Sequence, residues 1–220
     1  MKIARLASRV AIATAATVLA TTALGAPGAQ ATSGKSKPLG TTSLAAVLTR
    51  DTGGFDRNGR DFDILTAAVL AVLQAKPNSP VKVLTDGTVA LTTFAPTDTA
   101  FRLLVADLTS QRRLPTEQQA FAGVAGLGID TVEAVLLYHV VPGATIDRRA
   151  ALRSDGAALT TAAGATVRVD VTRYWYSSRV RLIDADTSDR DPRVVVFDIN
   201  RGNRQIAHAV DRVLRPSDLP

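Results

Sequence analysis

Two histidines are the residues of this chain with the most versatile chemistry. His139 lies in the apolar segment LLYHVVPG (residues 136–143), and His208 lies in the segment IAHAV (residues 206–210). A catalytic histidine needs a nucleophile or an acid within reach and an open cleft. The 220 residues contain no Gly-x-Ser-x-Gly elbow, no His-Glu-x-x-His pair and no cysteine. The sequence therefore indicates neither a hydrolase triad nor a zinc site.

The spacing of the apolar neighbours predicts an internal role for both rings. In a helix, His139 lies on the same face as Val135 and Leu136. In a strand, His208 faces inward together with the apolar residues two positions before and after it. A buried imidazole needs hydrogen-bond partners. We therefore expect two structural histidines, no catalytic residue, no metal and no cofactor. A hydrolase that uses His139 or His208 is the alternative.

A run rich in aspartate and glycine, DTGGFDRNGRD (residues 51–61), is the other segment with possible ligands. Its aspartates at positions 51, 56 and 61 offer carboxylate oxygens, which calcium prefers. An EF-hand loop places its ligands at every second residue, whereas these aspartates are five residues apart. We therefore interpret the segment as a loop and not as a calcium site.

Three adjacent aromatic residues, Tyr174, Trp175 and Tyr176, follow Arg173 and precede further arginines. Consecutive side chains on a strand point to opposite faces, so the three cannot all face inward. Aromatic and arginine side chains are enriched at binding hot spots, and aromatic rings also stack on sugar rings. The three aromatics are therefore candidate binding residues. The alternative is an edge strand with Tyr174 and Tyr176 on one side and Trp175 on the other.

Several segments have the features of helices that could position these residues. We predict helices at residues 43–48, at residues 62–75, from residue 97 and from residue 130. The segment 62–75 carries the strongest apolar stripe. Thr97 or Asp98 can accept hydrogen bonds from the free amides of the third helix. Asp130 and Glu133 have the spacing of a capping box.

Short apolar runs rich in β-branched residues predict the strands. They lie at residues 81–84, 89–94, 165–171, 174–183, 193–197 and 206–214. Asp86 and Gly87, between the first two runs, are typical of a hairpin turn. Most helices thus precede most strands. This order favours an α+β fold over an alternating parallel α/β fold.

The first 31 residues have the layout of a secretory signal peptide. Three basic residues precede an uncharged run (residues 10–24), and Ala29-Gln30-Ala31 is a small-x-small cleavage site. The run is shorter than the about 20 residues of a membrane-spanning helix. Residues 32–41 are typical of a flexible basic linker. We expect a secreted protein without an integral membrane segment after cleavage. Cleavage would halve the formal net charge of +6, which argues against nucleic acid as a partner.

Three segments occur in the order of one known family. TFAPTDTAF (residues 93–101), LLYHVVPG (136–143) and IAHAVDRVLRP (206–216) resemble the conserved segments of the fasciclin (FAS1) domain. The resemblance covers residues 42–216, which we take as the domain, and leaves residues 217–220 as a tail. It implies a wedge of β-strands packed with several helices, and extracellular adhesion or matrix binding without catalysis.

The resemblance also implies a set of contact residues. In animal fasciclin domains, integrin binding has been attributed to the Tyr-His segment and to an Asp-Ile pair ahead of the closing segment. These positions correspond to Tyr138, His139, Asp198 and Ile199. The tract 184–203 is longer and more charged than the family pattern. A buried Tyr-His pair serves the scaffold first, and it contacts a partner only if the region opens.

These observations predict a secreted, non-enzymatic adhesion or matrix-interaction domain. Its alanine- and arginine-rich composition and its leader are typical of a bacterial protein. We therefore expect an extracellular protein or a cell-wall or matrix polysaccharide as the partner. The alternative is an extracytoplasmic carrier of a small apolar ligand, which the aliphatic stripe of residues 64–73 suggests.

Overall fold

The computed structural model describes residues 37–217. The predicted leader, the first five residues of the predicted linker and residues 218–220 lie outside the described residues. The elements are α1 (Leu44–Leu48), α2 (Asp63–Ala75), the 3-10 helix η1 (Pro80–Thr85), β1 (Leu91–Pro96), α3 (Asp98–Leu108), α4 (Glu117–Gly126), α5 (Ile129–Tyr138), β2 (Val140–Pro142), α6 (Arg148–Ala151), β3 (Ala158–Thr160), β4 (Thr166–Arg173), β5 (Ser178–Ile183), β6 (Val194–Ile199) and β7 (Gln205–Val210). Most helices precede most strands, so the predicted α+β class is confirmed.

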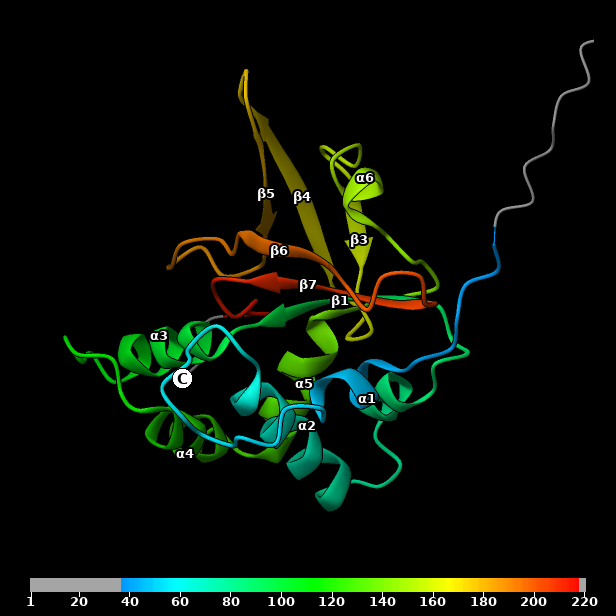
Figure 1. The fold of residues 1–220 in the computed structure, drawn as a ribbon. Helices are drawn as coiled ribbons and strands as arrows, with labels where there is room; N and C mark the ends of the chain where they lie inside the picture. The colour runs from blue at the N-terminus through cyan, green and yellow to red at the C-terminus, as the bar shows by residue number, and fades with distance from the viewer. Residues whose placement is uncertain (1–36, 218–220) are drawn as a thin grey trace, which may run out of the picture. The chain divides into compact units, whose positions relative to one another are not determined.

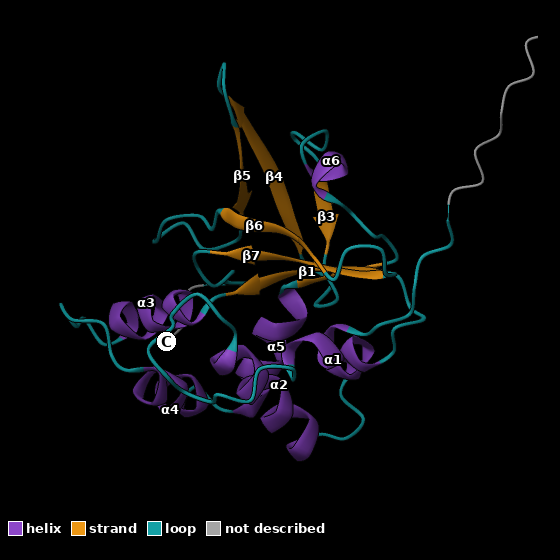
Figure 2. Cartoon of the chain, viewed as in Figure 1, coloured by secondary structure: helices purple, strands orange, loops and turns teal. Residues whose placement is uncertain are grey.

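The strands form two sheets. The larger sheet has the strand order β2-β1-β7-β6, and the smaller has the order β3-β4-β5. Strands β1 and β7 pair in parallel, with Phe94 opposite His208, and the other pairs are antiparallel. Helices α1–α5 gather on one side of β1 and β7, and the β4–β5 hairpin projects on the other side (Figure 1). The colours of Figure 2 separate this helical layer from the strands.

The apolar core has two parts. One cluster joins the helices to the larger sheet and includes Ile64, Val72 and Leu136. The other joins the two sheets and includes Tyr138 and Leu182. Because both faces of β1 and β7 are covered, every residue of these two strands is buried. The buried residues of these strands include the polar side chains of Thr92, Thr93, Gln205 and His208.

Among residues 37–217, no single helix has the length and apolarity to cross a membrane. Helices α4 and α5 reach that length and composition only as a pair, which is bent by 106°. Both helices contribute buried residues to the core cluster beneath the larger sheet.

The predicted strand at residues 81–84 is wrong, because Pro80–Thr85 form a 3-10 helix. Pro80 suits the first turn of a helix, where its missing N–H is not needed. The hydroxyl of Ser79 accepts a hydrogen bond of 3.2 Å from the Val81 N–H. Asp86 and Gly87 consequently do not join a hairpin. The second predicted run, residues 89–94, overlaps β1 (Leu91–Pro96), which pairs with β2 and β7 instead.

The sequence prediction omitted helix α4. A capping box starts this helix: Thr116 Oγ1 accepts from the Gln119 N–H at 3.2 Å, and Gln119 Oε1 accepts from the Thr116 N–H at 2.9 Å. The capping box predicted for the next helix is wrong. Helix α5 has Gly128 as its N-cap without a side-chain hydrogen bond, and Glu133 pairs with Lys76.

Candidate functional site

His139 is buried at the C-terminal end of α5, and both of its ring nitrogens have partners. The Nδ1–H donates to the Val135 carbonyl at 2.7 Å, and Nε2 accepts from the backbone N–H of Leu214 at 2.9 Å. Burial lowers the pKa of His139 to about 4. The ring is therefore neutral near pH 7, and neither nitrogen is available to a substrate or an ion.

His208 is buried in the middle of the larger sheet. Its Nδ1 accepts from the Asp198 N–H at 3.1 Å, and its Nε2–H donates to the Ile146 carbonyl at 2.8 Å. Burial lowers the pKa of His208 as well. The ring centres of Phe94 and Phe197 lie 6.1 and 5.3 Å from that of His208. The predicted burial of both histidines is confirmed, and neither ring is placed to act as a base.

Tyr138, a predicted contact residue, is fully buried beside His139. Its hydroxyl donates to the Thr166 carbonyl at 3.0 Å, which ties α5 to the first residue of β4. Together, Tyr138 and His139 connect α5 to two later segments of the chain. In this structure they hold the fold together and present no surface to a partner.

Asp198 and Ile199, the other predicted pair, point to different places. Asp198 has a φ of 64°, where the β6–β7 register is irregular, and a short polar residue tolerates this conformation. Its Oδ1 accepts from the Arg148 N–H at 2.7 Å. Ile199 packs against the core. The structure thus links Asp198 to His208 through a backbone hydrogen bond, but it places only Asp198 at a surface hollow.

The three adjacent aromatics form the tip of the β4–β5 hairpin. The pairing ends at Arg173 opposite Ser178, and the Tyr174 N–H donates to the Ser177 carbonyl at 2.8 Å. The prediction of a strand across residues 174–183 is therefore wrong at its start. All three side chains are exposed: Tyr174 by 43%, Trp175 by 95% and Tyr176 by 70%.

Contacts within the tip order these rings. The Trp175 and Tyr176 rings meet edge to face with centres 4.8 Å apart. The guanidinium carbon of Arg179 lies 5.1 Å from the centre of the Tyr174 ring, a cation–π distance. The tip therefore presents an array of rings with a cation beside it. Such an array can stack on a flat apolar face of a ligand.

The stem below the tip is held on both sides. Arg181 donates to the Asp170 carboxylate at 2.9 and 3.1 Å across the β4–β5 pair. Arg173 Nη2 donates to the Leu152 carbonyl at 2.8 Å, which attaches the stem to the C-cap residue of α6. Valines on the inner face, such as Val169, pack into the core between the sheets. The aromatic tip thus stands on a rigid support.

A basic hollow lies beside the stem. It has a volume of about 680 Å³ and is lined by Asp147, Arg148, Arg149, Leu152, Arg153, Asp198 and Arg201. Its four guanidinium groups outnumber its two carboxylates. Because Leu152 lines the hollow and also accepts the bond from Arg173, the hollow and the hairpin are adjacent. The sequence shows only a short run of arginines at 148–153, and the fold adds Arg201.

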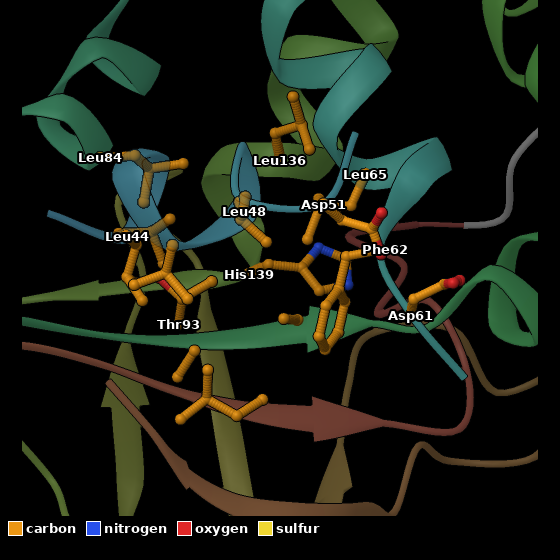
Figure 3. Close-up of a pocket in the computed structure, with 15 residues that line it drawn as sticks. Leu44, Leu48, Asp51, Asp61, Phe62, Leu65, Leu84, Thr93, Leu136 and His139 are labelled. Atoms are coloured by element: carbon orange, nitrogen blue, oxygen red, sulfur yellow. The ribbon is translucent and has the colours of Figure 1, made fainter. Parts of the chain in front are cut away.

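A small apolar cavity lies between the helices and the larger sheet (Figure 3). Its volume is about 90 Å³, and its lining includes Leu44, Leu65, Leu136 and His139. Cavities that hold a drug-sized molecule measure about 300–1,000 Å³. The predicted alternative function, a carrier of a small apolar ligand, requires a far larger cavity than this one.

Comparisons with known proteins agree with this architecture. The model of the Fasciclin domain family matches residues 65–216. Among solved structures, the chain is similar to a FAS1 domain pair from the insect cell adhesion molecule Fasciclin I, with a TM-score of 0.54 and 13% sequence identity. The match covers 80% of this chain and 51% of that one, so the chain spans about half the length of the pair. No curated protein matches the chain.

Proposed function

The chain belongs to the fasciclin domain family, and from this membership we propose that it is a secreted adhesion domain that binds an acidic extracellular polysaccharide. Fasciclin domains are generally involved in cell adhesion, are not known as enzymes, and typically occur in extracellular or secreted proteins. The leader predicted at residues 1–31 supports export. The binding surface we propose consists of the aromatic tip (Tyr174, Trp175 and Tyr176) and the basic hollow.

The exposure of Trp175 is the observation that carries this proposal. A large aromatic side chain buries roughly 150–250 Å² when it is covered, and 95% of Trp175 is in contact with solvent. Its neighbours Tyr174 and Tyr176 are exposed too. Aromatic faces of this kind stack on the apolar faces of sugar rings, and tryptophan and tyrosine are enriched at binding hot spots.

The arginines beside the tip favour acidic sugars over neutral ones. A guanidinium group pairs with two oxygens of a carboxylate, sulfate or phosphate at once. Arg148 is held over the Phe197 ring, with its guanidinium carbon 5.6 Å from the ring centre, and Arg173 is fixed by Leu152. A chain of acidic sugars could therefore stack at the tip and place its charges in the hollow.

Binding to dextran sulfate tests this proposal, with neutral dextran as the control polymer. We expect Trp175→Ala to weaken binding to dextran sulfate by about tenfold. The double change Arg149→Ala and Arg153→Ala should weaken it as well and reduce its dependence on salt. Leu70→Ala, at another exposed apolar residue, is the matched control and should bind like the wild type.

Three results would contradict the proposal. Equal binding of wild type and Trp175→Ala would exclude the tip, and equal binding to both polymers would exclude the acidic groups as determinants. Retention of an extracellular protein through Trp175, without any binding to polysaccharide, would assign the tip to a protein partner instead.

A further inference from the structure

Five carboxylate side chains meet where three helices begin. Asp56 and Asp61 come from the loop before α2, Asp63 opens α2, Asp98 opens α3 and Glu117 opens α4. One oxygen from each of Asp56, Asp61 and Asp63 lies within 4.8 Å of the others, and the same holds for Asp63, Asp98 and Glu117. Asp63 therefore belongs to both groups and lies at the centre of the cluster.

Two of these carboxylates are fixed by backbone amides. Asp98 accepts from the Ile64 N–H at 2.9 Å and from the Asp63 N–H at 3.2 Å, so it caps α2. Glu117 Oε2 accepts from the Asp56 N–H at 2.6 Å, which attaches the loop to α4. These bonds give Asp98 and one oxygen of Glu117 a structural role. They do not involve three other oxygens of the cluster.

Those remaining oxygens are buried and have no hydrogen-bond partner among the residues that the structure describes. They are Oδ2 of Asp63, Oε1 of Glu117 and Oδ1 of Asp61. Asp63 is only 9% exposed and Glu117 only 2%. A buried acceptor without a donor is rare in folded proteins. Three in one cluster indicate that a positively charged ligand belongs there.

The protein itself supplies little of the missing charge, although Arg102 is near enough to lower the pKa of Glu117 somewhat against the effect of burial. Within residues 37–217, none of the ion pairs includes a member of this cluster, and nearby Arg102 donates to the Pro115 carbonyl at 2.7 Å. Each helix N-terminus adds only about half a positive charge.

We propose that this cluster is a calcium site, with Asp63 as its central ligand and with Asp56, Asp61 and Glu117 around it. Calcium takes six to eight oxygen ligands at about 2.3–2.6 Å, so ligands on opposite sides of the ion lie up to about 5 Å apart. Within each of the two groups that share Asp63, the spacing of the oxygens fits this range. Magnesium requires ligands at about 2.0–2.1 Å in a near-ideal octahedron, and zinc prefers nitrogen and sulfur.

This site departs from the expectation of no metal, and its construction explains why the sequence does not reveal it. An EF-hand takes its ligands from one continuous loop. Here the loop supplies Asp56 and Asp61, whereas Glu117 comes from a helix that follows much later. A bound ion would cross-link the loop of residues 51–61 to α2 and α4. It would thereby stabilise the helical layer, which lies on the opposite side of the larger sheet from the hairpin tip (Figure 1).

Calorimetric titration of the EDTA-treated full chain with calcium chloride tests the proposal. We expect one ion per chain with a Kd of about 0.1–1 mM, the range of extracellular calcium modules. Calcium at ten times the Kd should raise the melting temperature by about 3–5 °C. Asp63→Asn and Glu117→Gln should each weaken calcium binding at least tenfold. Glu133→Gln, at a carboxylate paired with Lys76, is the control and should bind calcium normally.

The variants also give a result without metal. Because an amide removes one of the crowded negative charges, Asp63→Asn in EDTA should melt at or above the temperature of the wild type. If Asp63→Asn does not fold, Glu117→Gln gives the same test. The proposal is overturned if up to about 10 mM calcium produces neither heat nor a shift in melting temperature. Equal affinity for magnesium, or normal calcium binding by both variants, would overturn it too.

Discussion

The backbone N–H of Leu214 donates a hydrogen bond to Nε2 of His139, a residue 75 positions earlier in the chain. On its other side, the same ring donates to the Val135 carbonyl within α5. The imidazole therefore joins α5 to the segment that follows β7. It can do so only in its neutral form, because Nε2 accepts the bond and must carry no proton.

We expect His139→Gln to lower the free energy of unfolding by about 2–4 kcal/mol. A glutamine cannot satisfy both the Val135 carbonyl and the Leu214 N–H in the space of the ring, so one buried group loses its partner. Urea denaturation of both proteins at pH 7 measures the difference. A variant as stable as the wild type would show that the two hydrogen bonds contribute little.

The same ring should make the stability depend on pH. The pKa of His139 falls from 6.5 in the unfolded chain to about 4 in the fold because of burial. Between these values the unfolded chain binds the proton and the folded chain does not. The stability that the neutral His139 ring gives to the fold is thus fully present above pH 6.5 and is lost as the pH falls to about 4. Its size is about 3 kcal/mol, at about 1.4 kcal/mol per pKa unit.

Comparison of wild type with His139→Gln isolates this effect. Carboxylates that titrate in the same range, Asp63 among them, are common to both proteins and cancel in the difference. We expect the stability advantage of the wild type to shrink from pH 7 to pH 4. An advantage that stays constant over this range would mean that folding does not lower the pKa of His139.

Trp175→Ala should leave the fold unchanged. The side chain is 95% exposed and contacts Tyr176 at the hairpin tip, so its removal opens no cavity. We expect the free energy of unfolding to change by less than about 0.5 kcal/mol, as for most surface substitutions. Thermal unfolding followed by circular dichroism measures it. A larger loss would assign the tryptophan a structural role and would complicate the binding test above.

Arg215 anchors the C-terminal segment through a buried ion cluster. Its guanidinium group lies 2.8 Å from Asp107, 3.1 Å from Asp186 and 3.4 Å from Asp189. Removing one partner of a buried ion pair costs about 3–5 kcal/mol. We expect Arg215→Ala to lower the free energy of unfolding by that amount, measured in urea.

The exposed Arg190 provides the control for this change. Arg190→Ala should be nearly neutral, because the side chain lies at the surface and is absent from the ion pairs of the described residues. Equal losses in the two variants would indicate a general effect of net charge. Such a result would remove the special role of Arg215.

Local features of the fold could be predicted from the sequence, and long-range ones could not. The stripe that includes Ile64 and Leu65 identified α2, because helical burial is visible over a few turns. The parallel pairing of Phe94 with His208 leaves no local pattern. Helix α4 was missed because its sequence, EQQAFAGVAG, has two glycines and few large apolar residues.

The candidate sites show the same division. The aromatic triplet was recognised, but tyrosine and tryptophan favour strands, so the turn that closes at Ser177 was not predicted. The carboxylates of Asp63, Asp98 and Glu117 meet only because three helices begin at one place. These three residues are far apart in the sequence and form no recognisable spacing pattern, so the cluster could be found only in the structure.

Gly87 was predicted to form a hairpin turn, and the structure gives it another role. A Cβ atom at this position would lie 1.8 Å from the Thr41 carbonyl oxygen and 2.9 Å from the Ser43 N. The glycine therefore permits the segment before α1 to pass directly over the end of η1. Both close contacts involve backbone atoms, which cannot move aside as a flexible side chain can.

We expect Gly87→Ala to lower the free energy of unfolding by about 2 kcal/mol or more, because the overpacked backbone must shift. Gly126→Ala is the matched control, since a Cβ at the end of α4 would meet nothing within 4 Å. That change should be neutral or stabilise the protein by about 0.5–1 kcal/mol, because alanine loses less entropy in a helix. Urea denaturation of both variants decides the matter. If Gly87→Ala were as stable as Gly126→Ala, the segment before α1 would not lie against η1 in solution.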